Sequence, residues 1–462
     1  MVEKQKRIVW SALSRTPGIV ISLMLMLTVG AVLSYKALNT DPVISVPTPI
    51  IPMPNAYNYF VKAANSVVGG NKIGFAISKW DPTKQASGDE RLYNEMEKEA
   101  LVQENLVAIQ TLHTGFAYPF QAHPARSFTA SYSEYEKERG LARLLSLQAQ
   151  TQAAKGNWNG AMQSDLDSVQ MGEMMPHGST LIGKLVGIAC EAIGRRPAWE
   201  TVSHLNSLQA KTAARRLERI SSFHVPFAET LQEGEWAEQA SLLELMQKPD
   251  WSSKLTSLIE MSQEMQKPGW SGSLINPSEA GNGTWRHRLL ALRVELTGKR
   301  TITRNYARYM DQSIANAKQP YAAHPPAPVR PSDPLSQIMP RYATVDLNDV
   351  KAETQNRLLL VPLALCAYQQ DHGAYPEKLT ALVPAYLSAV PTDPFALSGP
   401  LRYKLTGKTY VLYSVGPDGK DDGGKPIFDA TQNPPAQNVS LDRRFMVNEN
   451  SKGDIVAGVN NW

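Results

Sequence analysis

The sequence has little cysteine and carries no strong net charge. Only two cysteines, Cys190 and Cys366, occur in 462 residues, which is too few for a disulfide framework. Both lie in apolar stretches, so we predict buried thiols, although a single disulfide outside the cytoplasm stays open. A net charge of +4 is too small to indicate nucleic-acid binding. With 42% apolar and 19% charged residues, the composition excludes a disordered chain and allows two or three folded domains.

Recognisable catalytic motifs are also lacking. The chain has no H-E-x-x-H zinc motif, no C-x-x-C pair, no G-x-S-x-G turn, no Walker loop and no G-x-G-x-x-G. Its eight histidines are scattered without the spacing of metal ligands. We therefore predict that the protein is not an enzyme. A hydrolase whose catalytic residues meet only in the folded chain stays open as an alternative.

A long apolar run is present near the amino terminus. Residues Pro17–Tyr35 carry no charge, and 19 residues at about 1.5 Å each can cross the hydrocarbon core of a bilayer. The run is preceded by the basic residues Lys4, Lys6, Arg7 and Arg15. They predict a cytoplasmic amino terminus and an extracytoplasmic remainder. No small-x-small site follows, so we favour a retained signal anchor over a cleaved signal peptide. The ten-residue run Leu358–Ala367 is too short to span and is read as a buried helix.

Composition divides the chain into several predicted segments. Residues 41–54 contain five prolines and predict an extended stalk, and a second proline-rich stretch predicts a linker. The predicted order is a cytoplasmic segment 1–16, a transmembrane anchor 17–36, a stalk 37–54, a helical domain 55–319, a linker 320–340, an α+β domain 341–432 and a tail 433–462.

The central region has helical periodicity throughout. The predicted helices are Asn55–Val68, Glu90–Thr111, Tyr132–Lys155, Asn159–Met175, Thr180–Thr201 and Ala210–Ser222. The pattern Ala154-x-Gly156-x-Trp158-x-x-Ala161 resembles the helix–turn–helix junction of tetratricopeptide repeats. This resemblance implies a close antiparallel helix pair. Because only one copy is visible, the sequence leaves open a closed bundle or a repeat-like superhelix.

The carboxy-terminal region predicts a helix that ends at His372-Gly373, then two strands at Leu401–Lys404 and Tyr410–Ser414. A loop rich in glycine and aspartate follows. Its three carboxylates (Asp418, Asp421 and Asp422) repel one another unless a positive group lies between them. Glycines allow the tight turns that point backbone carbonyls inward. We therefore predict that the loop binds Ca²⁺.

Residues 354–429 resemble the globular part of type II secretion major pseudopilins. The resemblance rests on the motifs Tyr368-x-x-x-x-Gly373-x-Tyr375-Pro376, Leu379-x-x-Leu382, Pro391-x-Asp393-Pro394 and Tyr413-Ser414-x-Gly416-x-Asp418-Gly419. It implies a calcium site with Asp418 as first acidic ligand, Asp421 and Asp422 as later ones, and carbonyls near Tyr413 and Ser414. The apolar run lacks the processing site and the acidic residue of that family, and it lies far from this module. We therefore do not expect assembly into a pseudopilus.

Together these observations predict a mainly α-helical protein with a small pseudopilin-like α+β end and one transmembrane helix. The layout also resembles large membrane-anchored bacterial proteins that end in such a module. The predicted role is structural or binding, with the membrane and a protein of the cell envelope as partners and no nucleic acid. An accessory component of a type II secretion-like or pilus-like assembly, and an envelope hydrolase without a recognisable motif, are the alternatives.

Overall fold

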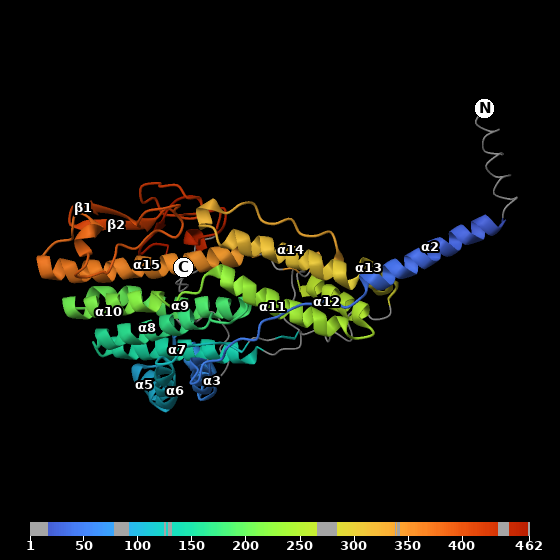
Figure 1. The fold of residues 1–462 in the computed structure, drawn as a ribbon. Coiled ribbons are helices and arrows are strands. Elements are labelled where there is room, and N and C mark those ends of the chain that lie inside the picture. The colour runs from blue at the N-terminus through green and yellow to red at the C-terminus, as the bar shows by residue number, and fades with distance from the viewer. Residues whose placement is uncertain are drawn as a thin grey trace. The chain divides into compact units, whose positions relative to one another are not determined.

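The computed structural model describes residues 17–77, 92–123, 126–127, 132–265, 284–337, 339, 342–432 and 443–460. Within these residues the chain forms fourteen α-helices and one small antiparallel sheet (Figure 1). The predicted mainly helical class and the apolar amino-terminal helix are thereby confirmed. The predicted cytoplasmic segment 1–16 lies outside the described residues, as do residues 433–442 and 461–462 of the predicted tail.

Contacts divide the chain into two compact units. The anchor unit comprises residues 1–46, 238–310 and 329–340, and the body unit comprises 47–237, 311–328 and 341–462. This division differs from the predicted domains, because residues 238–310 leave the helical domain and the α+β region joins it. The physical reason is a shared core: apolar residues of the central helices and of the carboxy-terminal region belong to one buried cluster.

The body unit is built mainly from helices that pack against one another. They are α3 (Ala56–Asn65), α4 (Gly70–Ile77), α5 (Glu95–Glu104), α6 (Leu106–Gly115), α7 (Ser133–Ala154), α8 (Trp158–Met174), α9 (Leu181–Thr201), α10 (Ser207–Ser221) and α15 (Ala343–His372). Short 3₁₀ turns occur at η1 (Val202–His204), η2 (Tyr321–Ala323), η4 (Leu379–Leu382) and η5 (Arg443–Phe445). The predicted hairpin is confirmed as α7 and α8, joined by a turn in which Gly156 has a φ of 75°.

The single helix predicted over Glu90–Thr111 is wrong, because two helices meet at Asn105. The buried Asn105 side chain donates to the carbonyls of Val68 and Leu101, at 3.1 and 2.8 Å, and accepts from the Val68 N–H at 2.7 Å. A buried amide needs such partners, so a contact distant in sequence overrides the local helical pattern.

Helices α8 and α9 approach closely through glycine. A Cβ atom placed on Gly187 would lie 2.5 Å from the carbonyl oxygen of Gly172, and one on Gly194 would lie 2.3 Å from that of Asp165. Side chains larger than hydrogen cannot fit at these crossings without moving the backbone. These glycines therefore set the helix separation that places the polar residues described below.

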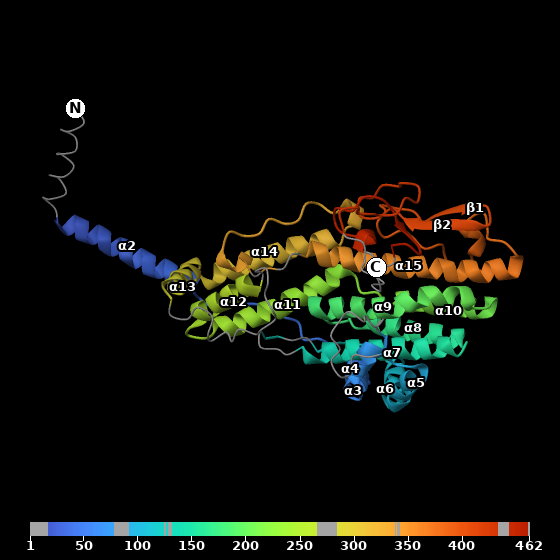
Figure 2. The ribbon, with the colours of Figure 1, turned by 180° about the vertical axis from the view of Figure 1, so that it is seen from behind.

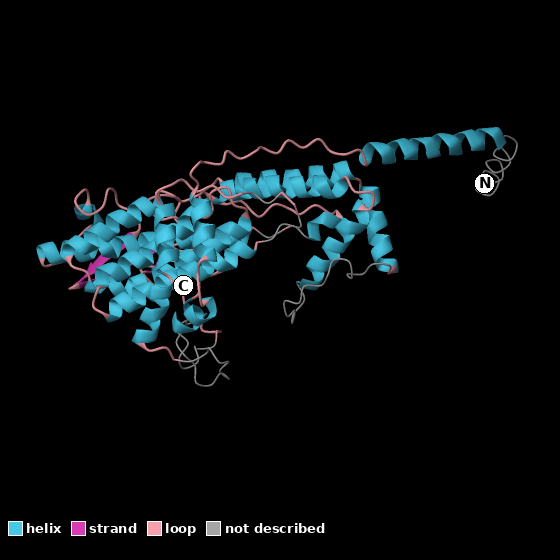
Figure 3. Ribbon diagram, turned by 90° about the horizontal axis from the view of Figure 1, so that it is seen from below, coloured by secondary structure: helices cyan, strands magenta, loops and turns pink. Residues whose placement is uncertain are grey.

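The three-stranded sheet packs on α15 in the body unit. Strands β1 (Arg402–Thr406) and β2 (Thr409–Ser414) form the predicted hairpin, and β3 (Ile455–Val456) pairs with β2; both pairs are antiparallel. Helix α15 ends at His372, and the next residue, Gly373, has a φ of 76°, which confirms the predicted stop. Leucines along α15 share one core with α10 and with Leu412 and Ile455 of the strands. Figures 1 and 2 show α15 between α10 and the strands, and Figure 3 shows how little of the chain is strand.

The anchor unit contains α2 (Pro17–Leu38), α12 (Trp251–Met265), α13 (Trp285–Thr297) and η3 (Pro334–Gln337). Helices α11 (Phe227–Met246) and α14 (Lys299–Ala317) contribute residues to both units. Leu255, Ile259, Val294 and Ile302 are fully buried and supply apolar packing. Asn305 donates to Asp333 at 2.8 Å, which connects α14 to the segment that carries η3.

Candidate functional site

Helix α2 is the clearest candidate for membrane attachment. Its segment Ile21–Leu38 is long and apolar enough to cross a bilayer, and none of it is buried against the rest of the protein. An apolar helix of this length is unfavourable when its side chains are exposed to water and is stabilised when they are surrounded by lipid. The structure is therefore compatible with a single-pass anchor at this helix.

The carboxy-terminal end of α2 is held by polar contacts within the anchor unit. The Tyr35 hydroxyl donates to the Glu295 carboxylate, and the Asn39 amide donates to the Glu295 carbonyl at 3.2 Å. Lys299 forms an ion pair with Asp41 at 2.6 Å. Gly298 also contacts the backbone of Leu38, where a Cβ would clash at 2.9 Å from the carbonyl oxygen. These contacts attach α2 to the junction of α13 and α14.

A serine, a histidine and a glutamate meet between α12 and α13. The Ser253 hydroxyl lies 2.9 Å from Nε2 of His287, and Nδ1 of the same ring lies 2.9 Å from Oε2 of Glu260. His287 is buried, whereas Ser253 and Glu260 are partly exposed. This order of contacts is that of a nucleophile, a general base and the acid that orients the base.

The sequence did not indicate this triad, because its members come from two helices and match no local motif. Ser253 and Glu260 are seven residues apart, two helical turns, and His287 approaches from the next helix. A second role fits the same contacts: both nitrogens of a buried imidazole need partners, and the three residues join α12 to α13. The triad is thus a candidate site and also a helix-to-helix connection.

The body unit contains a buried chain of charged side chains. Lys184 of α9 lies 2.6 Å from Oδ1 of Asp349 on α15, and it also donates to the Val225 carbonyl at 2.7 Å. The two side chains are only 2% and 5% exposed. Burial raises the pKa of Asp349, although the neighbouring charges of Lys184 and His224 oppose the rise. Such a pair is tolerated in a core only when every polar atom has a partner.

His224 continues this chain toward α8. Its Nε2 lies 3.7 Å from Asp349 and its Nδ1 lies 3.4 Å from Oε2 of Glu173. Burial lowers the pKa of His224, but the hydrogen bond to Glu173 and the charge of Asp349 outweigh it and raise the pKa to about 9. The imidazole is therefore a cation near neutral pH.

Asn356 of α15 forms the other end of the buried chain. Its amide nitrogen donates to Glu173 at 2.9 Å and to Glu191 at 2.8 Å, and its oxygen accepts from Arg195 at 2.7 Å. Burial raises the pKa of Glu191 to about 8, with a contribution from the negative charge of Glu173. One neutral amide thus connects two carboxylates and a guanidinium that are all inside the protein.

We call the residues Lys184, Asp349, His224, Glu173, Asn356, Glu191 and Arg195 the ionic core. The sequence analysis missed it, although a signal was present: Lys184, Glu191 and Arg195 are spaced by seven and four residues in a helix whose first two-thirds are otherwise apolar. That spacing places them on one face. Because the members interlock three helices, the ionic core specifies how α8, α9 and α15 pack.

Within the part of the chain that the structure describes, neither oxygen of Glu138 on α7 or of Asp165 on α8 has a hydrogen-bonding partner, and both acids are buried. Burial, with a smaller effect of Glu134, raises the pKa of Glu138 to about 8. Burial likewise raises the pKa of Asp165 well above its usual value. Glu138 is therefore mostly protonated near neutral pH, and each of the two unpartnered acids costs the fold free energy.

In the predicted calcium loop, the carboxylates of Asp418 and Asp421 accept hydrogen bonds from nearby groups of the protein. Asp421 accepts from Arg402 at 3.2 Å, from the Tyr413 hydroxyl at 3.0 Å and from the Gly423 N–H at 3.0 Å. Partial burial raises the pKa of Asp421, yet these three donors lower it overall. Asp418 accepts from the Lys420 N–H at 3.2 Å. Arg402 thus supplies positive charge that the sequence argument assigned to an ion.

Ser414 and Asp422 form hydrogen bonds to two other acids of this region. The Ser414 hydroxyl donates to Asp393 at 2.6 Å, and Asp393 also accepts from the Val415 N–H at 2.9 Å. The N–H of Asp422 donates to Asp454, an acid that the sequence analysis did not single out. Among the described residues, no three histidine, cysteine, aspartate or glutamate side chains lie close enough to share a metal ion.

Both cysteines are free thiols: Cys190 is buried and Cys366 is half-buried.

Comparison of the chain with protein-family models, with curated proteins and with solved structures found no match. Function must therefore be argued from the residues themselves.

Proposed function

We propose that this protein is a single-pass membrane protein whose helical body binds a partner protein on the extracytoplasmic side of the cell envelope. The observation that carries the proposal is α2, an apolar helix that is exposed along its spanning segment. Its carboxy-terminal turn and the residues just after it are attached to the folded chain. The orientation follows from the basic residues that precede the helix. The role of the body is structural or binding rather than catalytic.

Membrane extraction and protease accessibility test this proposal. The full chain should stay in the membrane fraction at alkaline pH, and external protease should digest the body in cells with a permeable outer layer. Lysine at Leu25 and Val29, near the middle of α2, costs about 2.5–3.5 kcal/mol per residue and should release the chain. Lysine at Leu208, an exposed leucine of α10, is the matched control and should not. Release of the unmodified chain, or full protection of the body, would refute the proposal.

A second candidate function is ester or amide hydrolysis at Ser253. The triad geometry favours it: the hydroxyl, the imidazole and the carboxylate are each within 2.9 Å of the next. Ser253 also lies in the first turn of α12, where backbone N–H groups lack helical acceptors and can stabilise an oxyanion. A fluorophosphonate probe should label Ser253 and not the Ser253→Ala variant. Absence of labelling at neutral pH would leave the triad as a structural connection.

Calcium binding at the aspartate loop remains part of the proposal, with Asp418, Asp421 and Asp422 as the side chains that would hold the ion. Because Arg402 already pairs with Asp421, ion binding would have to rearrange the loop. Alanine at Asp418 should then lower the melting temperature in calcium and have little effect in chelator. Equal destabilisation in both buffers would argue against a metal.

The partner may be tested without assuming its identity beyond the envelope. Crosslinking in cells, followed by recovery of the chain, should capture an envelope protein. Recovery of pseudopilins or of an inner-membrane platform protein would support the alternative of an accessory component of a secretion-like assembly. Recovery of other envelope proteins alone would count against that alternative.

A further inference from the structure

Helix α13 carries an apolar stripe that faces solvent. Its residues are Trp285, Leu289, Leu292 and Leu296, spaced by four, three and four residues, so they stack along one side of the helix. They are 69%, 59%, 51% and 61% exposed. His287 and Val294 lie on the opposite side and are buried. The helix thus buries one face in the anchor unit and leaves an equally apolar face uncovered.

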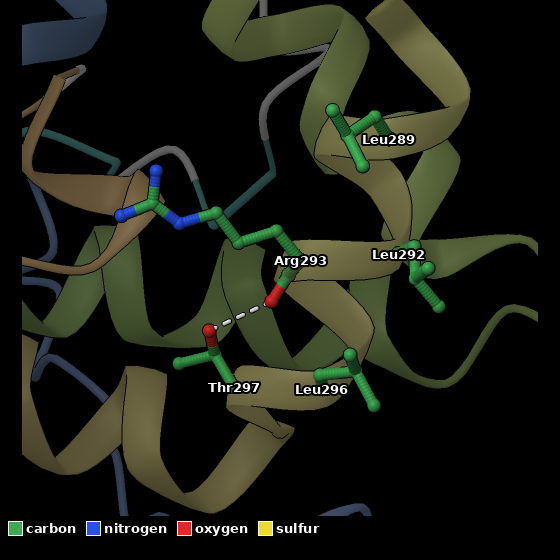
Figure 4. A pocket seen from close by; sticks show the side chains of 5 residues that line it. All are labelled: Leu289, Leu292, Arg293, Leu296 and Thr297. Carbon is green, nitrogen blue, oxygen red and sulfur yellow. Dashed lines mark hydrogen bonds between the residues drawn. The ribbon is translucent and has the colours of Figure 1, made fainter. Parts of the chain in front are cut away.

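Basic side chains border this stripe. Arg286, Arg288 and Arg293 lie beside it on α13, and Arg300 follows on α14, whereas Glu295 is the one acid within Trp285–Thr297. The Arg286 guanidinium lies over the Trp285 ring at 5.5 Å. Figure 4 shows the three leucines along one side of α13, with Arg293 extending away from them; these side chains and Thr297 line an open hollow. An apolar stripe with a basic border is typical of helices that lie in the membrane interface.

The attachment of α2 places α13 at the height where a spanning helix leaves the bilayer. Glu295, on α13, accepts from Tyr35, which is one turn before the end of α2. Figure 1 views α13 nearly along its axis beside this end of α2, while α2 itself runs across the picture. A helix that crosses the direction of a spanning helix lies along the membrane surface.

The faces of α13 are also arranged for that position. Glu295 and Gly298 meet α2 on one side of the helix, and His287 contacts α12 on another. At about 100° per residue, the apolar stripe lies opposite the buried side and about a quarter turn from Glu295. The face of α13 that contacts neither α2 nor α12 is therefore the apolar one.

We infer that α13 lies in the headgroup region of the bilayer that α2 spans, with its leucines in the acyl boundary and its arginines on anionic phospholipid headgroups. The inference rests on the proposed anchoring by α2 and adds a second contact with the membrane. It explains the uncovered leucines and the basic border together. A second copy of the chain or a partner protein could also cover the leucines, but neither would account for the contact with the end of α2.

Site-specific fluorescence quenching in nanodiscs tests the inference on the full chain. In a background without native thiols (Cys190→Ala and Cys366→Ala), single cysteines at Leu292, Leu25 and Leu208 would carry an environment-sensitive nitrobenzoxadiazole label. The lipid would contain phosphatidylglycerol and, in separate samples, a doxyl quencher near the headgroup for the Leu292 label or one deep in the acyl chain for the Leu25 label. Quenching at Leu292 should be several-fold stronger than at Leu208 and should weaken in purely zwitterionic lipid. Leu25, inside α2, is the internal reference for insertion.

Each result decides between specific possibilities. Strong quenching at Leu25 with Leu292 no different from Leu208 would overturn the inference and leave the anchor intact. Absence of quenching at both Leu25 and Leu292 would refute the anchor itself, and the inference with it. A blue shift of the Leu292 label that depends on protein concentration in detergent, without lipid quenching, would show that a second copy covers the stripe.

Discussion

Removal of the Lys184 ammonium is the most direct test of the ionic core. In Lys184→Met the side chain keeps nearly its length, but Asp349 loses its 2.6 Å partner and the Val225 carbonyl loses a donor. Among the described residues, His224 at 3.7 Å would then be the remaining ion-pair partner of Asp349. Breaking a buried pair by removing one partner typically costs about 3–5 kcal/mol. A cost of that size is a large fraction of the stability of an ordinary domain, which is about 5–15 kcal/mol.

Thermal unfolding followed by circular dichroism should detect this loss as a melting temperature lower by roughly 5–10 °C. The matched control is Lys155→Met, because Lys155 pairs with Glu99 on the surface, where both side chains are about half exposed. An exposed pair contributes about 0–1 kcal/mol, so the control should melt close to the unmodified chain.

The double variant Lys184→Met, Asp349→Leu distinguishes loss of a pair from loss of packing. Replacing both charges removes the uncompensated carboxylate, so it should recover most of the stability that Lys184→Met loses. The reasoning is refuted if Lys184→Met melts within a degree or two of Lys155→Met, or if the double variant is no more stable than the single one.

Three further outcomes follow from burial and close packing. Gly187→Ala should lower the free energy of unfolding by about 1–3 kcal/mol, because its Cβ would lie 2.5 Å from the carbonyl oxygen of Gly172. Gly140→Ala, with open space around it, is the control and should leave the free energy of unfolding unchanged or raise it by up to about 1 kcal/mol. Urea unfolding measures both. Glu138→Met should stabilise the chain by about 1–3 kcal/mol by removing an unpartnered acid. Because the pKa of Glu138 is raised to about 8, that gain should grow as pH rises from 5 to 8, and a constant gain would contradict the assignment. Since the pKa of His224 is raised from 6.5 to about 9, its stabilising effect is complete below pH 6.5 and lost as pH rises through 9; His224→Gln should therefore differ most from the unmodified chain at pH 6 and least above pH 9.

The sequence predicted the elements whose signals are local. The apolar run before Lys36 predicted α2, the His372-Gly373 pair predicted the end of α15, and the two short extended stretches that follow predicted β1 and β2. These succeed because a helix stop, a turn or an apolar segment depends on a few neighbouring residues. The break at Asn105 did not follow from the sequence, because the groups that satisfy its side chain include Val68, far away along the chain.

The candidate sites show the same limit. Nothing in the spacing of Ser253, Glu260 and His287 indicates that they touch, because the contact depends on how α12 packs against α13. The aspartate loop was visible in the sequence, but its Asp421 pairs with Arg402 on a strand, which only the pairing of β1 with β2 brings near.

The sequence by itself thus determined that this protein is mainly helical, carries an apolar helix able to span a membrane and ends in a small sheet. The tertiary structure alone decided which polar residues are buried together, where the chain divides into compact units and which face of α13 remains uncovered. The physical reason is the range of the interactions. Helix and strand formation follow nearby residues, whereas ion pairs, shared cores and exposed stripes exist only after distant segments have packed.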